Sequence, residues 1–365
     1  MGEEGASGAA AGAGSLAGLS PAAMRALVAE TGAPPYRAQQ LFRWVHVRGA
    51  SSYEAMTDVP KALREGLAAR LPVRSSRIVE THRSEDGTVK LLVGLADGES
   101  VECVLIPEGD RRTACISTQV GCGVGCVFCA SGARGVVRNL EAHEIVEQVL
   151  WLREAAAPPA ELGAAPAAER LSNLVVMGMG EPLHNVGALV EALRVVQDPE
   201  GIDLGSRRIT VSTSGPLKGF EEFLAAGLKV HLAVSLHAAF DDLRQRLVPR
   251  GGTGTVDQLR DMARRWFEKT GRDTTFEYVL LDGINDRDED AHALARVAGR
   301  HRNVNLIPMN PVPFAPDLRA PPPERTERFA AILRNASIVV HVRRQRGDDV
   351  AAACGQLKLA REGAA

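Results

Sequence analysis

Three cysteines stand close together in the segment CGVGCVFC, where Cys122, Cys126 and Cys129 have a C-x3-C-x2-C spacing. A structural zinc site needs four thiolate or imidazole ligands, and this segment contains no histidine to complete one. Three thiolates on a [4Fe–4S] cluster leave one iron open to a ligand that the protein does not supply. The glycines of the segment let the backbone pass closely around such a bulky group. The spacing therefore favours a [4Fe–4S] cluster over a zinc ion or three unligated thiols.

Three further cysteines lie outside this segment: Cys103, Cys115 and, more than 200 residues after the cluster motif, Cys354 in GDDVAAACGQLK. A lone cysteine among small residues usually packs as a small hydrophobe, and we expect this of Cys103. The first residues have no basic region followed by an apolar run, and the longest apolar runs are too short to span a membrane. We therefore expect a cytoplasmic protein whose cysteines bind metal or react rather than form structural disulfides.

The elements that must position these residues alternate between strand and helix from residue 113 onward. Apolar, β-branched runs predict strands at 113–118, 173–178, 208–213, 230–236, 275–281, 303–308 and 337–342. Helices are predicted at 141–156, 187–197, 216–227, 239–248, 256–270, 287–300 and 323–336. Cysteines, glycines, hydroxyls and amides follow the ends of these strands, which is where (β/α) barrels carry their chemistry. The pattern predicts an α/β fold with an incomplete (β/α) barrel.

The remaining chain predicts three further regions. Residues 1–19 read as a tail of Gly, Ala and Ser, 20–75 as a small helical domain, and 76–112 as connecting β-strands, before a barrel over 113–365. The formal net charge is −2, so the whole chain lacks a nucleic-acid signature, but residues 16–75 hold eight Lys or Arg against four Asp or Glu. A basic cluster also occurs at 342–347. Such clusters are solvated surfaces or RNA contacts, and charge alone does not decide between them.

Longer motifs carry a resemblance to a known family. The cysteine motif after the first barrel strand and GMGEP after the second resemble the radical S-adenosylmethionine superfamily. The ordered series CISTQVGCGVGCVFCASG, VVMGMGEPLHN, RRITVSTSG, LAVSLHA, EYVLLDGIND, NVNLIPMNP and RGDDVAAACGQL is similar to the RlmN branch of the RNA adenosine methyltransferases. The resemblance covers residues 20 to 358, and the basic N-terminal helices resemble that family's RNA-binding accessory domain.

This resemblance implies a role for each matching residue. Cys122, Cys126 and Cys129 would bind the [4Fe–4S] cluster, Cys354 would become S-methylated, Cys115 would be its disulfide partner, and Glu102 would accept a proton. The cofactor S-adenosyl-L-methionine would be contacted by Gly180, Glu181, Ser212, Ser235, Leu236, His237 and Asn310. The implied partners are 23S rRNA, tRNA and an electron donor such as flavodoxin or ferredoxin, and the implied state is a monomer.

The implied reaction uses two S-adenosylmethionine molecules for each methyl group added to C2 of adenine. The first methylates Cys354; reductive cleavage of the second gives a radical that takes hydrogen from the S-methyl group, and the resulting carbon radical adds to C2. Glu102 then removes the C2 proton, and Cys115 attacks the Cys354 sulfur to release the RNA. The main alternative is the relative that methylates C8 of the same adenosine, against which Pro182 and STSG favour the C2 branch. A radical enzyme without a methyl-carrying cysteine and an RNA-binding scaffold with a structural metal are the other readings.

Overall fold

The computed structural model describes residues 14–133, 135–157, 170–250, 252–299, 303–343, 346–353 and 355–357. Within these residues, ten strands form one sheet in the order β1-β2-β3-β4-β7-β8-β9-β10-β11-β12. The first three strands are antiparallel to their neighbours, and every later neighbouring pair is parallel. In the described chain β12 pairs only with β11, so the barrel is open on that side.

The parallel part of the sheet confirms the seven barrel strands predicted from the apolar runs. They are β4 (Arg111–Cys115), β7 (Asn173–Val176), β8 (Ile209–Thr213), β9 (His231–Ser235), β10 (Thr275–Leu280), β11 (Asn303–Pro308) and β12 (Val339–Val342). Four of them, β4, β7, β9 and β10, end one to three residues before their predicted ends, where the chain leaves the sheet to form loops, and β4 begins two residues before its predicted start. Parallel order places all these loops at one edge.

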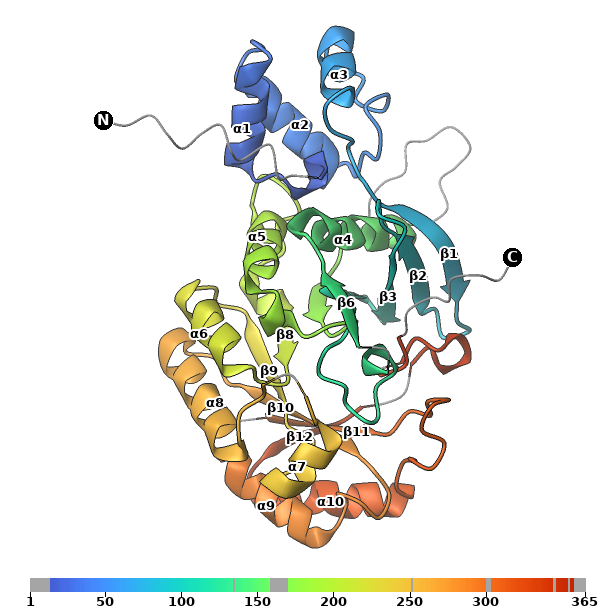
Figure 1. Ribbon diagram of the computed structural model, residues 1–365, viewed down its shortest axis with the longest axis vertical. Helices are drawn as coiled ribbons and strands as arrows, with labels where there is room; N and C mark the ends of the chain where they lie inside the picture. Colours follow the sequence, from blue (N-terminus) through green and yellow to red (C-terminus); the bar gives the residue numbers. More distant parts are fainter. Residues whose placement is uncertain are drawn as a thin grey trace.

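Helices connect the parallel strands and cover the outer face of the sheet (Figure 1). They are α4 (Ala142–Ala156), α5 (Val186–Gln197), α6 (Leu217–Ala225), α7 (Asp241–Leu247), α8 (Val256–Thr270), α9 (Asp288–Ala298) and α10 (Pro323–Asn335). Contacts run from α4 to α5, α6, α8, α9 and α10 in turn. Their buried residues join those of the strands in one large apolar cluster, which fixes the strand ends that carry the site.

The N-terminal region consists of a short 3-10 helix, η1 (Leu16–Gly18), and of α1 (Pro21–Glu30), α2 (Tyr36–His46) and α3 (Lys61–Ala68), drawn in blue in Figure 1. The Ser20 hydroxyl caps α1 by accepting a hydrogen bond from the Ala23 N–H (3.2 Å), and Pro21 takes the first helical position, as the sequence predicts. On α4, the buried Glu147 carboxylate accepts hydrogen bonds from Ser15 Oγ (2.5 Å) and from the Ser75 and Ser76 amides (2.8 Å each). One carboxylate therefore joins both ends of this region to the barrel.

Three antiparallel strands link that region to the barrel: β1 (Arg77–Arg83), β2 (Val89–Gly94) and β3 (Ser100–Glu108). The sequence predicts β2 and β3 with a turn at 96–99, and the turn forms there, with Gly98 in a positive-φ conformation (93°). A separate two-stranded hairpin, β5 (Gln119–Gly121) and β6 (Val136–Asn139), frames the cysteine motif. Short 3-10 helices lie at η2 (Ala130–Gly132), η3 (Pro182–His184), η4 (Ser206–Arg208) and η5 (Asp348–Val350). Among the described residues, no helix has the length and apolarity needed to cross a membrane.

Candidate active site

A pocket of about 970 Å³, its open mouth included, lies where the loops after the parallel strands meet. Nine of the residues that the sequence singles out line it: Cys122, Cys126, Cys129, Gly180, Glu181, Ser212, Ser235, His237 and Asn310. They come from the last residues of β8 and β9 and from the loops after β5, β7, β9 and β11, so the fold brings together residues almost 190 positions apart. Leu236, Glu102 and Cys115 do not line this pocket.

The cysteine loop is held by backbone hydrogen bonds rather than by its side chains. Cys122 N–H donates to the Gly135 carbonyl (3.0 Å) across the base of the β5–β6 hairpin. Gly121 has a φ of 79°, and a Cβ there would lie 2.1 Å from the Gly135 oxygen, so the hairpin base requires glycine. The Val127 N–H donates to the Leu247 carbonyl at the end of α7 (3.1 Å). These contacts fix the loop from both sides, independently of any bound group.

The three thiols suit a cluster better than a single ion. Burial raises the pKa of all three, that of Cys122 to about 12, so an uncompensated thiolate is unfavourable here. A bound cationic centre supplies that compensation. In the described part of the chain no three Cys, His, Asp or Glu side chains converge closely enough to hold one metal ion. A [4Fe–4S] cluster instead binds each thiolate through a different iron, and the residues present fit this group.

The loop after β7 lies against the strand that leads into the cysteine hairpin. Gly180 has a φ of 102°, and a Cβ there would lie 2.7 Å from both the backbone N and the Cβ of Gln119. This close approach lets the Glu181 N–H donate to Gln119 Oε1 (2.8 Å). The GMGEP segment therefore needs its second glycine for contact with the hairpin.

The Glu181 carboxylate is fully hydrogen bonded inside the protein. It accepts from Leu183 N–H (3.0 Å) and Thr213 Oγ1 (2.6 Å) on one oxygen, and from the Ser214 N–H (2.7 Å) and hydroxyl (2.8 Å) on the other. Four bonds match the acceptor capacity of a carboxylate. Glu181 thus joins the loops after β7 and β8 at the wall of the pocket.

The His237 ring, after β9, is neutral, and a hydrogen bond to the backbone fixes its orientation. Burial, reinforced by Arg244, lowers the pKa of its ring to about 3. Its Nδ1 accepts a hydrogen bond from the Val279 N–H (3.1 Å), which leaves Nε2 as the protonated nitrogen. His237 has a φ of 59°, unusual for a residue with a side chain, and its ring makes an edge contact with Phe128 of the cysteine motif (4.7 Å between centroids). Neighbouring Leu236 is fully buried in the core, so only its backbone is near the site.

A row of polar side chains crosses the pocket floor. Ser235, Glu277 and Asn305 are register partners on β9, β10 and β11, and the Asn305 amide donates to Glu277 Oε1 (2.8 Å). Ser212 Oγ lies 3.3 Å from Ser235 Oγ. Burial raises the pKa of the Glu277 carboxyl, although Arg343 and the Asn305 hydrogen bond act in the opposite sense. Sequence reasoning missed Glu277, because its strand pattern reads as a continuous buried run.

Arg244 is a second residue that sequence reasoning missed. It sits on α7 in the segment DDLRQRL, which reads as a solvated helix, yet it is 3 % exposed. Its guanidinium donates to the Ser214 carbonyl (2.7 Å), the Gly254 carbonyl (3.1 Å) and Thr253 Oγ1 (3.0 Å). Burial lowers its pKa to about 10, so it remains a cation near Cys126. Arg244 places a fixed positive charge beside the cysteine loop.

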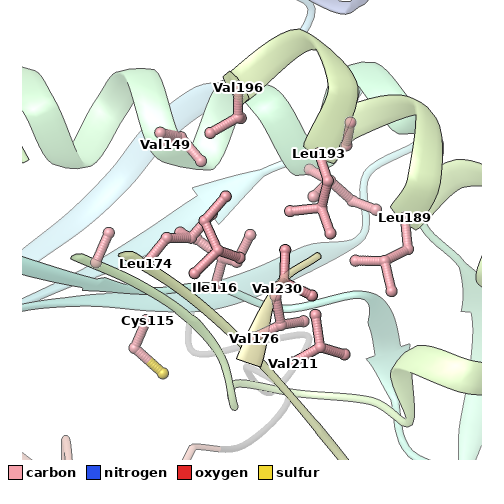
Figure 2. Close-up of a cluster of buried hydrophobic side chains, with 14 of the residues drawn as sticks. Cys115, Ile116, Val149, Leu174, Val176, Leu189, Leu193, Val196, Val211 and Val230 are labelled. Carbon is pink, nitrogen blue, oxygen red and sulfur yellow. The ribbon is translucent and has the colours of Figure 1, made fainter. Parts of the chain in front are cut away.

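Glu102 and Cys115 lie on one face of the sheet, outside the pocket lining. Cys115 is the register partner of Val104, two residues from Glu102, so the two side chains project to the same side. Figure 2 shows the Cys115 sulfur pointing away from the apolar cluster of Val149, Leu189 and Leu193. Cys103 projects to the opposite face and is fully buried, which confirms it as a core residue. No disulfide joins any two of the described cysteines. The expected Cys115–Cys354 disulfide therefore finds no support in this structure, in which Cys354 lies outside the described residues.

Cys354 lies outside the described residues, but the segments on both sides of it are described. Before it, Asp349 accepts from Ser84 Oγ (2.5 Å) and Glu85 N–H (3.2 Å), and Gly347 N–H donates to Asp86 (3.1 Å), all in the β1–β2 turn. After it, the Gly355 carbonyl accepts from the Ala130 N–H (2.7 Å) of the cysteine loop. The red C-terminal segment in Figure 1 accordingly lies beside β1 and β2.

The basic N-terminal residues divide into two groups. Arg74 is buried, pairs with Glu154 (3.1 Å) and stacks on Trp151 (4.1 Å), so it belongs to the contact with α4. Arg43 on α2 and Arg48, two residues after its end, are exposed, and Arg48 covers the Trp44 ring (4.1 Å). These two arginines and Trp44 line a hollow in the surface, together with Tyr36, Gln39, Gln40 and Asp58. Arginines interleaved with aromatic rings are typical of single-stranded nucleic-acid surfaces.

Two family models match this chain. Residues 15–73 match the ribosomal RNA large subunit methyltransferase N-terminal domain, and residues 116–295 match the radical SAM superfamily. The two matches therefore cover the blue helices and most of the parallel sheet in Figure 1. Between and beyond them lie β1 to β4 and the segments from β11 onward.

Individual proteins match over nearly the whole chain. A protein of Symbiobacterium thermophilum named probable dual-specificity RNA methyltransferase RlmN is 45% identical over 94% of this chain and 91% of its own length. A protein of the same name from Rhodopirellula baltica is 46% identical over 90% of this chain and 86% of its own. The crystal structure of a radical SAM methyltransferase from Sphaerobacter thermophilus, 45% identical, superposes with a TM-score of 0.87 over 94% of this chain and 98% of that one.

Proposed function

This chain belongs to the RlmN family of radical S-adenosylmethionine RNA methyltransferases, and we propose that it methylates C2 of adenosine. The proposed substrates are an adenosine in the peptidyl-transferase centre of 23S rRNA and the adenosine 3′ to the anticodon in some tRNAs. The hollow formed by α2 and the residues after it, with Arg43, Trp44 and Arg48, is the proposed contact for the RNA backbone and for unstacked bases.

The pocket residues divide the binding of the two cofactors. Cys122, Cys126 and Cys129 would hold the [4Fe–4S] cluster. The ends of β8 and β9 and the loops after β7, β8, β9 and β11, which line the same pocket, would hold S-adenosylmethionine. When bound, the cluster supplies the electron that cleaves S-adenosylmethionine to a radical able to remove hydrogen from a methyl group. His237 offers its Nε2–H at any pH above its low pKa, and the Ser212 and Ser235 hydroxyls and the Asn310 amide add donors and acceptors for the ribose and the methionine. The apolar walls of Val176, Val279 and Ile307 exclude water from that chemistry.

Three side chains carry the methyl transfer itself. Cys354 would accept a methyl group from one S-adenosylmethionine, lose one hydrogen atom of that group to the radical formed from a second, and bond through the remaining CH2 carbon to C2 of adenine. Glu102 would take the C2 proton as the adduct returns one electron to the bound cluster. The Cys115 thiolate would then attack the Cys354 sulfur and break its bond to the CH2 carbon, which leaves a Cys115–Cys354 disulfide and, after protonation of that carbon, the methylated base. A second S-adenosylmethionine is consumed in each cycle.

One observation carries this proposal. The segment that bears Cys354 is anchored to the β1–β2 turn on one side and to the cysteine loop on the other. Glu102 and Cys115 project from the sheet face on that same side, and Lys90 of this face hydrogen bonds to the Ala351 carbonyl (3.3 Å). Glu102, Cys115 and the chain on both sides of Cys354 therefore lie on one side of the sheet, which supports their proposed roles as base, resolving thiol and methyl acceptor. Packing alone gives no reason for this arrangement.

The test separates the two reactive thiols. Cys354→Ala removes the methyl acceptor, so neither protein S-methylation nor methylated RNA should form. Cys115→Ala leaves the earlier steps intact, so the protein should stall as a covalent RNA adduct that nuclease removes on a denaturing gel. Cys103→Ala is the matched control, because Cys103 neighbours Cys115 but faces the core; it should turn over normally.

Three outcomes would contradict the proposal. Normal turnover by Cys115→Ala, or the same phenotype for Cys115→Ala and Cys103→Ala, would show that Cys115 is not the resolving thiol. NMR of the product nucleoside locates the methyl group, and a methyl group on C8 would assign the chain to the other branch of the family.

A further inference from the structure

Lys90 is a buried cation to which no role has yet been given. It lies on β2 with its side chain 8 % exposed, and its ammonium is 3.0 Å from Glu102 Oε1, whose side chain is equally buried. Lys90 and Glu102 are diagonal neighbours on one sheet face, because Lys90 is opposite Val104 and Glu102 is opposite Leu92. Burying a charged amine requires a reason, since an unpaired charge in the interior is strongly unfavourable.

The same ammonium also reaches the C-terminal segment. Its Nζ donates to the carbonyl of Ala351, at 3.3 Å, three residues before Cys354. Ala351 has a φ of 50°, a conformation that is unfavourable for residues other than glycine. Lys90 thus bonds at once to the carboxylate on β3 and to a strained peptide of the segment that carries the methyl-accepting thiol.

We propose that Lys90 is the positioning residue of the proton-transfer step, which holds the Glu102 carboxylate in its orientation beside the Cys354 segment. This inference rests on the proposed function, in which Glu102 accepts the C2 proton. A general base must lie within hydrogen-bond reach of the proton that it removes, so the orientation of this carboxylate matters for the step. Lys90 supplies the counter-ion without competing as a base, because an ammonium has three donors and no acceptor.

Other titratable groups lie on the neighbouring strand position and in the β1–β2 turn. Burial, reinforced by the charges of Cys115 and Glu102, raises the pKa of the Cys103 thiol well above its ordinary value, so this thiol stays neutral. Asp86 and Asp349 belong to the β1–β2 turn contact, where Asp86 bonds to Gly347 and Asp349 to Ser84. The C-terminal segment therefore keeps several anchors when Lys90 is replaced. Loss of the ammonium should affect Glu102 more than the placement of the segment.

The experiment compares Lys90→Met, Lys90→Arg and Glu102→Gln in the reconstituted holoprotein with its RNA. Intact mass spectrometry gives the fraction of protein with S-methylated Cys354 and the fraction in a nuclease-sensitive RNA adduct; the rate of methylated RNA release is measured beside them. Lys90→Met should S-methylate Cys354 within about twofold of wild type, yet release RNA about 100-fold more slowly and accumulate adduct, since general-base catalysis contributes at least that factor. Lys90→Arg, which keeps the charge, should release RNA within about tenfold of wild type.

A double variant and a surface control complete the test. If Lys90 acts through Glu102, adding Lys90→Met to Glu102→Gln should slow release no further. Lys61→Met, which removes an exposed lysine paired with Glu65 (3.7 Å), should behave as wild type. The inference is overturned if Lys90→Met releases RNA at the wild-type rate, or if it loses S-methylation and release equally and Lys90→Arg restores neither. Normal release by Glu102→Gln would instead refute the role of Glu102 in the proposed function.

Discussion

The contact between the N-terminal region and the barrel depends on one carboxylate, and its removal should have a large, local effect. Glu147 is fully buried and accepts hydrogen bonds from two consecutive backbone amides, Ser75 and Ser76, and from the Ser15 hydroxyl. In Glu147→Gln one acceptor oxygen becomes an NH2 donor. The serine hydroxyls can rotate to accept from it, but a backbone N–H cannot, so one buried amide loses its acceptor.

The magnitude follows from those contacts. An orphaned buried donor costs about 1–3 kcal/mol, and hydrogen bonds to a charged acceptor are worth about 1.5–3 kcal/mol, so the docked state should weaken by about 2–4 kcal/mol. At one decade per 1.4 kcal/mol, the amides of α1 and α2 should exchange with solvent about 30- to 700-fold faster. Hydrogen–deuterium exchange with mass spectrometry of the anaerobic holoprotein measures this directly.

Glu154→Gln on the same helix is the matched control. Glu154 pairs with Arg74 at 3.1 Å, but its side chain is 40 % exposed, so its loss should weaken docking by no more than about 1 kcal/mol. Equal exchange rates in the Glu147→Gln and Glu154→Gln variants would refute the argument that the buried carboxylate holds this contact.

Three further predictions concern acid stability, the cluster and RNA. The pKa of His46 is lowered to about 3, mainly by burial. Below pH 6.5 the unfolded chain binds a proton at His46 and the folded chain does not, so the free energy of unfolding decreases as the pH is lowered, by about 2 kcal/mol at pH 5. His46→Leu should remove that part of the loss of unfolding free energy between pH 7.5 and pH 5, and an unchanged loss in urea titrations would contradict it. Cys126→Ala should abolish the visible absorption and most of the iron and sulfide of the anaerobic protein, whereas a Cys103→Ala protein should keep four of each; stoichiometric zinc in the wild type would overturn the cluster assignment. Arg43→Gln with Arg48→Gln should weaken RNA binding and lower the salt slope of log K by about 2, without changing S-adenosylmethionine cleavage; an unchanged slope would mean that RNA binds elsewhere.

Local pattern was enough to predict the barrel. Each of the seven parallel strands combines an apolar, β-branched run with a flanking turn or cap, and such signals depend only on neighbours in the sequence. The edge strand β1 was predicted only in outline, as part of the connecting β region, because its sequence RIVETHR is mostly polar and mostly exposed. Its partner β2, fully buried, carries the clear signal.

Residues whose role depends on distant contacts could not be predicted in this way. Arg74 counts towards a basic surface in the sequence, but a glutamate on α4 and the Trp151 ring bury it. Arg244 reads as an exposed helical arginine, and it is buried because several oxygen acceptors of loops far along the chain converge on it. The pairing of Lys90 with Glu102 depends on the register of two strands, which a sequence pattern does not specify.

The distribution of site residues between matched and unmatched parts of the chain has a mechanistic meaning. The segment that matches the radical SAM superfamily, residues 116–295, contains the three cysteines proposed to bind the cluster and the residues from Gly180 to His237 proposed to contact S-adenosylmethionine. Glu102, Lys90 and Cys354 lie outside it and outside the matched N-terminal domain. The β1–β2 turn and the C-terminal segment, which hydrogen bond to each other, also lie outside both matches.

We infer that the superfamily core supplies the radical chemistry, while the flanking strands and the C-terminal segment form a separate unit for carrying a methyl group. The two units meet where the Gly355 carbonyl accepts a hydrogen bond from Ala130 of the cysteine loop. Such a division explains why the flanking β-strands extend the parallel sheet at its β4 edge rather than forming a domain apart: Cys115 ends β4, the strand shared by both units. The proposed resolving thiol, Cys115, pairs with Val104 and therefore projects to the same face as Glu102, while the residues after it lead into the β5–β6 hairpin that frames the cysteine motif.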